Sequence, residues 1–594
     1  MGRLALVARL VLADLRRHPA QAVLLLLAVT AATATFALGV SLRGASDTLY
    51  ERTRAATAGP DVVALAPDPG PAADRTLTAL TRAPGVVAYH GPYQIVYTAL
   101  IARGFTSQVV VHGAAETPGS VDRPLVTSGR WVRPGGAVLE RGFATALGVG
   151  VGDRVTIAGR SYPVEGIAVT AATSIYPWAA QIGPGGGPSD WTGLAWLTPP
   201  EARALAASGD LPVTTALDIR LRDPDAAEAF VDARSGPAVR VTFHTWQFKA
   251  RQDAVILNSA QPILVVGGWL LSFLAVAGVA TLAAGRTAAQ TYRAGLLKAV
   301  GATPGLIAAV LLTEYLALAL AADVLGLVVA QLAGPAIASP TASRIGGVAG
   351  PAGGTVLATT VLAVGVAALS ALPATVRALR TATVTALAGP VQRPRHRPGL
   401  MALSALLPTP LLLGLRLMAR RPGRAVLHAC STAATLITVT VLLFHLAQPS
   451  RHYGVGAASL PHLRDVHDRR LLLAVTVLLV ALAVVNTVAL TWTTAMETRA
   501  NMAVARTLGA TPWQVSAGLS AAQVLPAVLG ALAGLPLGIG LYRLIGMGKM
   551  VMPPWTWLLA ATLAILAATA VCAALPARLA ARRPVAPTLS AETA

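Results

Sequence analysis

Long runs of apolar residues alternate along the chain with short polar connections that carry most of its arginines and lysines. Crossing the hydrocarbon core of a bilayer takes about 20 apolar residues, because a helix rises about 1.5 Å per residue. Largely uncharged runs of that length predict eight membrane-spanning helices, at approximately 21–42, 262–285, 305–333, 354–376, 424–447, 471–493, 513–542 and 553–575.

Residues 43–258, between the first and second runs, have ordinary polar sequence punctuated by glycine and proline. A segment of this length can bury a core of its own, so it predicts a separate water-soluble domain. Its apolar and polar patterning indicates an α+β fold. We expect strands at Val86–Tyr89, Gln94–Ala102, Gln108–Val111, Ala137–Leu139, Arg154–Ile157 and Ala216–Leu221, and helices at Pro199–Ala207 and Pro224–Ala233.

One polar phrase occurs twice, at Leu297–Pro304 and at Ala505–Pro512, each time between two apolar runs. Basic segments before runs 1 and 5, and Leu-Pro-Ala after runs 4 and 8, are repeated as well. The chain is therefore predicted to contain an internal duplication, with eight transmembrane helices arranged as two four-helix repeats. The first repeat carries the large domain, and the second has only the short outer stretch 448–470.

We call the two polar connections, residues 286–304 and 494–512, the first and second elbows. In each, a glycine suits the end of one helix and a proline suits the first turn of the next. Each elbow is therefore predicted to be a rigid bracket that a cytoplasmic partner can push. The simpler alternative is a tight turn without a partner.

The composition supports a membrane location, since 54% of residues are hydrophobic and only 12% are charged. Lys and Arg concentrate in short connections that the positive-inside rule places in the cytoplasm. Both termini are then cytoplasmic and the large domain lies outside. The expected cytoplasmic parts are an amphipathic helix at 1–20, the two elbows, a linker with a second amphipathic helix at 377–423, and a tail at 576–594. The membrane spans are expected within 21–42, 262–376 and 424–575.

The net charge of +21 is spread over many loops instead of forming one stripe with aromatic residues. This distribution is typical of topology determinants that face anionic lipid, and it argues against a nucleic-acid partner. The first apolar run is longer than the 7–15 residues usual in a signal peptide, which favours a retained anchor over a cleaved leader.

Enzymatic chemistry is not indicated. The nearest approach to a phosphate-binding loop, residues 546–550, lacks the first glycine and the final hydroxyl residue. The histidines are scattered without ligand spacing, so we expect them at the surface or at its boundary with the core, and we expect no metal site. No activated nucleophile is evident either, and no catalytic residue is assigned.

Together these motifs make the chain resemble the FtsX-like and MacB-like permeases, which are membrane subunits of the ABC transporters called mechanotransmitters. The resemblance rests on the elbow sequence 293–302 with Glu314 shortly after it, on Leu372-Pro373 followed by Arg377 and Arg380, and on Gly129-Arg130-Trp131, Val138-Leu139-Glu140 and Tyr162–Ile167 in the outer domain. It implies a MacB-like extracytoplasmic domain.

The resemblance also implies two copies of a separate cytoplasmic ABC ATPase, which would hold ATP and Mg²⁺, while this chain would hold no cofactor and would not itself be an enzyme. The residues expected to couple to the ATPase are Arg293, Leu296, Leu297, Lys298, Gly301, Arg499, Arg506 and Gly509. The second elbow departs from the family pattern, because Val504-Ala505-Arg506 replaces Gly-Leu-Lys and Gln523 stands where an acid is expected.

By the same resemblance, the expected function is export or extraction of an amphiphilic substrate, peptide or lipoprotein across a bacterial plasma membrane. The alternative is mechanotransmission without transport, which activates an extracellular protein partner such as a cell-wall hydrolase. A channel or ion-driven transporter working alone is disfavoured because charged residues are scarce within the spans.

Three polar residues are expected within or near the bilayer: Glu314, Asp323 and Asn486. A charged side chain at a helix centre costs about 2.5–3.5 kcal/mol on insertion scales, so Asp323 should face other helices. It can form an interhelical hydrogen bond or line a path, and Glu314 can pair with Arg293. Gly530, Gly534 and Gly538 recur every four residues and predict either a packing seam or a sliding surface.

Overall fold

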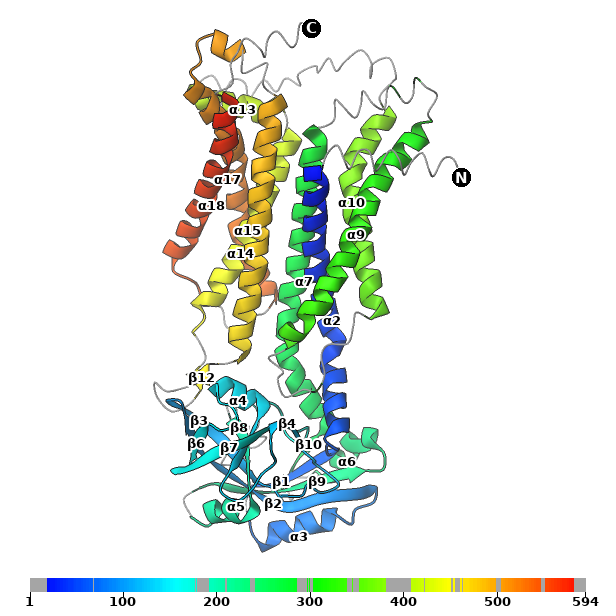
Figure 1. Cartoon of the computed structure of the whole chain (residues 1–594), viewed down its shortest axis with the longest axis vertical. Helices are drawn as coiled ribbons and strands as arrows, with labels where there is room; N and C mark the ends of the chain where they lie inside the picture. The colour runs from blue at the N-terminus through cyan, green and yellow to red at the C-terminus, as the bar shows by residue number, and fades with distance from the viewer. Residues whose placement is uncertain are drawn as a thin grey trace.

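The computed structural model describes residues 19–67, 69–176, 178, 192–208, 211–235, 241–285, 296, 299, 303–338, 345, 352–380, 408–420, 422–449, 452–453, 460–461, 463–497, 504–545 and 551–581. The molecule is elongated, with a bundle of long helices at one end and a strand-rich head at the other (Figure 1). Helix α2 starts, and helix α18 finishes, at the end of the bundle remote from the head.

The long helices follow the apolar runs. They are α2 (Pro19–Ala56), α7 (Trp246–Gly285), α9 (Pro304–Ala338), α10 (Gly353–Arg380), α14 (Pro422–Ala447), α15 (Leu463–Glu497), α17 (Pro512–Ile545) and α18 (Trp555–Ala581). Among the described residues, seven helices are long and apolar enough to cross a membrane. The remaining predicted span, 21–42, is the first along the chain and lies in α2. The apolar part of α2, Leu25–Ser41, is shorter than those of the seven other helices, so a count of eight spans is not confirmed.

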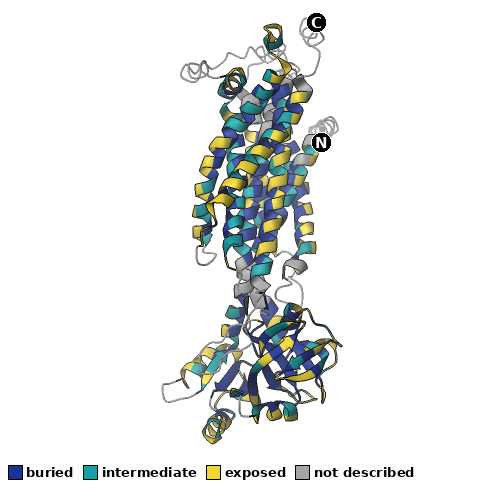
Figure 2. Cartoon of the chain, turned by 90° about the vertical axis from the view of Figure 1, so that its left-hand side faces the viewer, coloured by how far each residue is buried: buried dark blue, intermediate teal, exposed yellow. Residues whose placement is uncertain are grey.

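The bundle has two groups of neighbouring helices. Buried apolar residues of α2, α7, α9 and α10 form one core, and a second core draws on α2, α7, α14, α15, α17 and α18. Helices α7 and α15 contact each other and join the groups. The exposed side chains lie along the outer surface of the bundle, where lipid would meet it, while the strands of the head are mainly buried (Figure 2).

A short amphipathic helix, α13 (Thr409–Arg420), precedes α14 and packs on α17. The contact is close because glycines remove side chains on both sides: a Cβ added at Gly414 would lie 2.7 Å from the Ala521 Cβ, and one at Gly518 would lie 2.9 Å from the Leu413 Cβ. This helix falls within the predicted segment 377–423. Residues 1–18 and 381–407 lie outside the described residues.

The three repeated glycines of α17 line its contact with α14. A Cβ added at Gly530 would lie 2.1 Å from the Ala429 carbonyl oxygen, and one at Gly534 would lie 2.9 Å from the Ala433 carbonyl oxygen. Backbones therefore meet directly, which is how helices without a hydrophobic driving force between them gain close packing. The glycine repeat forms a packing seam in this conformation.

This seam predicts a position-specific cost for a single methyl group. Gly530→Ala should destabilise the chain by about 1–3 kcal/mol, because the new Cβ overlaps backbone that cannot move aside. Gly540→Ala is the matched control, since the same helix has open space there. Thermal unfolding in detergent should show a lower midpoint for the first variant alone, and equal midpoints would contradict the seam.

The head contains ten paired strands: β1 (Val62–Ala66), β2 (Val86–Ala102), β3 (Phe105–Gly113), β4 (Leu125–Gly129), β5 (Ala137–Glu140), β6 (Arg154–Ile157), β7 (Arg160–Val169), β8 (Thr192–Leu197), β9 (Val213–Leu221) and β10 (Thr242–Thr245). Strand β6 pairs with both β2 and β7. As a result β2, β3, β8, β5, β7 and β6 close into a ring, which we call the barrel.

The barrel is filled by apolar side chains from its strands and from α4 (Arg141–Leu147). Glu140 begins α4 by accepting hydrogen bonds from the backbone of Gly142 (2.7 Å) and Phe143 (2.8 Å). Phe143 then packs against Gly193 of β8, where an added Cβ would lie 2.3 Å from its ring. Helix α5 (Pro199–Ala206) lies beside β2 and β3.

A second lobe shares strand β2 with the barrel. The first part of β2 pairs with β9, and the last part pairs with β3. On its other side β9 pairs with β1, which in turn pairs with β10. Helices α3 (Pro71–Leu80) and α6 (Ala227–Asp232) cover this sheet and bury a core against β1 and β9. The 17-residue strand β2 therefore ties the two lobes into one head.

The head stands on a stalk made by the ends of α2 and α7. Helix α2 continues unbroken to Ala56, and α7 starts at Trp246 directly after β10. Trp246 stacks on Tyr50, with ring centroids 6.3 Å apart, and the Arg54 guanidinium lies 4.7 Å above the Trp246 ring. Arg54 also pairs with Asp61. The segment predicted as domain, 43–258, thus begins and ends with stalk helix.

Candidate functional site

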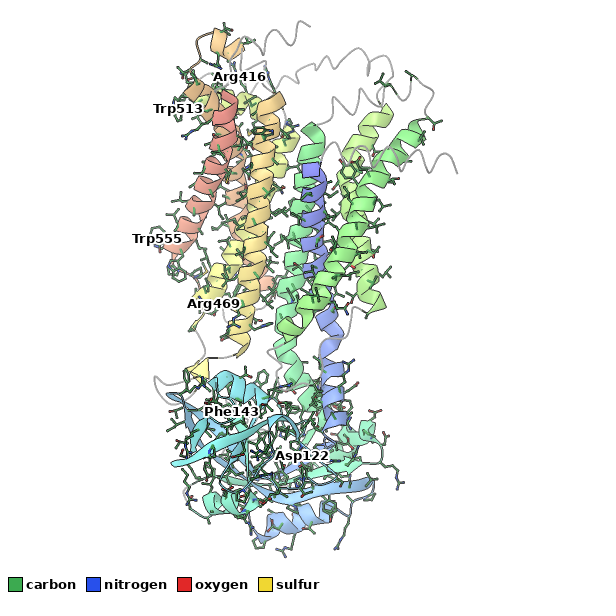
Figure 3. All side chains as sticks on the ribbon, in the orientation of Figure 1. Asp122, Phe143, Arg416, Arg469, Trp513 and Trp555 are labelled. Carbon is green, nitrogen blue, oxygen red and sulfur yellow. The ribbon has the colours of Figure 1, made fainter. Side chains whose placement is uncertain are left out.

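The second elbow is a short bracket at the end of the bundle remote from the head (Figures 1 and 3). Residues 504–507 are helical, and Gly509 ends this turn with a φ of 98°, a left-handed conformation that favours glycine. Ala510 donates a backbone hydrogen bond to Ala505 (3.0 Å), as in a Schellman motif. The predicted helix end at this glycine is confirmed.

The start of α17 completes the bracket. The Thr511 amide donates to the Gln514 Oε1 (2.9 Å), and the Gln514 amide donates to the Thr511 Oγ1 (3.3 Å). This reciprocal pair is a capping box, and Pro512 occupies the first helical position, where its missing N–H costs nothing. Residues 504–514 are therefore fixed by backbone bonds around Gly509 and by side-chain bonds to the backbone at the start of α17.

Apolar side chains project from this bracket. Leu508 is 83% exposed and Trp513 is 67% exposed, although both are large hydrophobic residues. Behind them the elbow is anchored, since Ala510 packs against a small core whose buried members are Ala495, Val515, Leu519 and Ala577. Trp513 is thus held at the tip of the bundle, far from Asp122 in the head (Figure 3). Exposed apolar groups at this end of the bundle are available for contact with a protein partner or with the membrane surface.

The first elbow is described only in part. Arg293, Leu297, Lys298 and Gly301 lie outside the described residues, as does Arg499 in the second elbow. Leu296 is helical and exposed. At the start of α9 the Leu306 amide donates to the Thr303 Oγ1 (3.3 Å), so the threonine and proline of this copy begin a helix as those of the second copy do.

Polar residues within the bundle bind neighbouring helices. The Thr360 hydroxyl of α10 donates to the Asp323 Oδ2 of α9 (2.8 Å). The Asn486 side-chain amide of α15 donates to the Leu274 carbonyl of α7 (3.0 Å). Glu314 is buried in α9. Both hydrogen bonds join different helices, and the bond from Asn486 links the two helix groups.

The outer stretch of the second half contacts the head, which the sequence did not indicate. Two short strands, β11 (His452–Tyr453) and β12 (Leu460–Pro461), pair between α14 and α15. Leu460 is fully buried and belongs to the barrel core. Strand β12 lies beside α4 and β3. We call this contact the Leu460 latch, because it attaches the second half to a head that the first half carries.

A single charge should open this latch. Leu460→Asp places a carboxylate in an apolar core without a partner, so the loop should leave the barrel. Trypsin cleavage at Arg451 should then accelerate by more than about tenfold, since a buried leucine contributes about 2–5 kcal/mol. Leu125→Asp, at an exposed position of β4, is the control. Equal cleavage rates in the two variants would contradict the latch.

A cluster of ionisable side chains, three of them buried and one half-buried, lies where the head meets its stalk. His90 of β2 and Asp218 of β9 are register partners, with His90 Nδ1 and Asp218 Oδ2 3.4 Å apart. Asp122 follows β3 and accepts from the Thr170 hydroxyl (2.6 Å). Lys249, in the first turn of α7, is fully buried. We call these four residues the stalk cluster.

The protonation of the stalk cluster is strongly perturbed. Burial, followed by the charge of Asp218, raises the pKa of Asp122 to about 7. Burial lowers the pKa of Lys249 to about 7. Hydrogen bonding to Asp218 raises the pKa of His90. Burial lowers the pKa of the nearby His112 to about 4. The expectation that histidines lie at the surface is wrong for His112, which is 4% exposed.

Comparison with known proteins is consistent with this architecture. The model of the FtsX-like permease C-terminal domain matches residues 265–383 and 473–585. The model of the MacB-like periplasmic core domain matches residues 22–234. The first therefore matches two separate helix segments, and the second matches the head together with most of α2. No curated protein matches the chain.

Two solved structures resemble part of the chain. The extracellular domain of the noncanonic ABC-type transporter YknZ from Gram-positive bacteria is 10% identical, with 31% of this chain and 100% of that chain covered and a TM-score of 0.20. The periplasmic region of MacB from Actinobacillus actinomycetemcomitans is 10% identical, with 32% and 92% covered and a TM-score of 0.20.

The two family models, matching in the expected order over the head and both helix segments, identify the chain as an ABC transporter permease of the FtsX-like and MacB-like family. It is a multi-pass membrane protein and the membrane component of such a system, which works with a cytoplasmic ABC ATPase.

Proposed function

We propose that two copies of a separate ATPase grip the two elbows, and that closure of these ATPases around ATP and Mg²⁺ drives a stroke that the helices relay to the head. In this arrangement the elbows and both termini are cytoplasmic, the head is outside, and the membrane is a bacterial plasma membrane. The observation that carries the proposal is the second elbow, where Leu508 and Trp513 are exposed on a bracket that is fixed to the bundle.

Two routes are available for such a stroke. The first runs from the second elbow through α15 to α7, which contacts α15 in the bundle. The other end of α7 is joined to the head, because α7 starts directly after β10. The second runs along α14 and α15 to the Leu460 latch. A stroke on either elbow therefore reaches the same head. Packed helices with two stable arrangements suit such a relay better than a continuously deformable tube does.

The substrate proposed for the stroke is an amphiphile, a peptide or a lipoprotein that is exported or extracted at the outer face of the membrane. The two apolar cores of the bundle support transport outside the helices over transport through a water-filled pore. The head and the lipid-facing bundle surface would then meet the substrate together.

A charge at the second elbow tests ATPase docking. Leu508→Asp should weaken binding of the ATPase by at least about tenfold, because exposed apolar anchors carry most of the energy of an interface. Leu544→Asp is the matched control, since Leu544 is 84% exposed at the opposite end of α17. Co-purification and ATPase rate in nanodiscs measure the effect. Undiminished binding by Leu508→Asp would contradict docking there. Leu296→Asp examines the first elbow in the same way.

Stimulation of the ATPase by substrate tests whether the stroke moves an amphiphile. ATPase activity of the complex in nanodiscs should rise when an amphiphilic peptide or a lipoprotein is added, because substrate binding favours one of the two bundle states. Leu460→Asp should abolish this stimulation while it retains the basal rate. The contrary result has two parts: no amphiphile stimulates the ATPase activity, and ATP hydrolysis by the complex activates an extracellular enzyme that co-purifies with it. That result would favour mechanotransmission without transport.

A further inference from the structure

The stalk cluster brings together three metal-ligating side chains from three separate parts of the head. His90 and Asp218 come from β2 and β9, and Asp122 comes from the connection after β3. One nitrogen or oxygen atom from each of the three lies within 4.8 Å of the others. Asp122 is held there by a φ of 51° and by its amide, which donates to the Ala58 carbonyl (3.0 Å).

The hydrogen bond between His90 and Asp218 is long, and its length also matches the separation of two ligands on one ion. Charge-assisted N–H···O bonds are typically about 2.7–2.9 Å long. His90 Nδ1 and Asp218 Oδ2 are 3.4 Å apart. Two ligands bound at about 2.0–2.1 Å to a tetrahedral ion are separated by about 3.3 Å. The two strands therefore hold the imidazole and the carboxylate at the separation that a shared ion would require.

Unpartnered atoms provide a second and independent observation. Asp218 is 0% exposed and has hydrogen bonds to His90 and to the Tyr93 hydroxyl, but its Oδ1 atom has no hydrogen bond to a described residue that meets distance and angle limits. The Lys249 Nζ is also buried and donates no hydrogen bond to a described residue, so the lysine does not satisfy that oxygen directly. A buried carboxylate oxygen left without a partner is costly, and buried charges are normally paired or coordinate metals.

We infer that His90, Asp122 and Asp218 bind a divalent first-row transition-metal ion, of which Zn²⁺ and Mn²⁺ are the best candidates. One imidazole with two carboxylates suits these ions, whereas Ca²⁺ and Mg²⁺ prefer shells made of oxygen alone. Three protein ligands leave one coordination position for water. Asp218 would bind the ion through Oδ2, and its open Oδ1 has lone pairs left for a second contact with the same ion.

The position of this site gives it a structural role. The ion would join β2 and β9 to the connection that contains Asp122. In this connection the amides of Asp122 and Arg123 donate to the carbonyls of Ala58 (3.0 Å) and Thr57 (2.6 Å), which directly follow α2. The bound ion would therefore fasten the head to its stalk. This inference does not depend on the proposed transport function, because it concerns how the head is attached.

Metal binding can be measured on the full chain in nanodiscs, without a histidine tag, after a chelator has been used and removed. Calorimetric titration with Zn²⁺ and, separately, with Mn²⁺ should show one ion per chain, and bound metal should be verified by elemental analysis. His90→Gln should weaken binding by more than about tenfold, since even outer-shell changes cost 10- to 100-fold. His244→Gln, at a histidine of β10 outside the cluster, should bind as the wild type does.

Folding is controlled by comparing the thermal unfolding midpoints of the metal-free proteins, and Asp122→Asn replaces His90→Gln if the latter unfolds early. The bound ion should raise the midpoint of the wild type and not that of either variant. X-ray absorption of the Zn²⁺ form should show one imidazole and oxygen ligands. Equal uptake by the wild type and His90→Gln, absence of a stoichiometric ion, or a sulfur-containing shell from Cys430 or Cys572 would each overturn the inference.

Discussion

Helix α7 packs against α15 along the middle of the molecule, and this contact holds the two groups of helices together. It is tight because Gly267 of α7 faces Val475, where an added Cβ would lie 2.6 Å from a valine methyl carbon, and because Asn486 donates to the Leu274 carbonyl. In a bilayer, water cannot pair such polar atoms and apolar helices gain little from association, so small residues and interhelical hydrogen bonds decide which helices meet. The relay proposed above requires this interface, since α7 carries the head and α15 precedes the second elbow.

The sequence predicted those parts of the fold whose physical signal is local. Seven spans follow directly from apolar length, and the glycine and proline of the second elbow mark the helix boundaries that are observed. Strand β6 occupies the predicted residues Arg154–Ile157. Strands β1 and β8 were missed because they are buried on both faces, which leaves no alternation of apolar and polar residues for a period of two to reveal. Helix α4 was missed because it is a single short segment whose start depends on Glu140.

The functional groups that depend on contacts between distant residues could not be predicted in the same way. His90, Asp122 and Asp218 lie far apart in the chain, and the pairing of β2 with β9 brings two of them face to face, so spacing along the sequence could not indicate this cluster. Leu460 is one leucine in a short outer loop, and its burial in the barrel depends on a head from the other half of the chain. By contrast, the repeated phrase and the family resemblance singled out Arg506 and Gly509, whose coupling role stays a prediction, but they did not single out the exposed Leu508 and Trp513 beside them.

The length of α7 has a mechanical consequence. Its 40 residues run without interruption from the bundle into the head. At about 1.5 Å per residue such a helix is roughly 60 Å long, so a swing of about 10° about one end carries the other through about 10 Å. Pro262 lies inside it, near the start of the apolar span at Ala260, and removes one backbone hydrogen bond there. A lever with one softened point near the membrane surface can convert a small rotation among lipid tails into a large sideways displacement of the domain it supports.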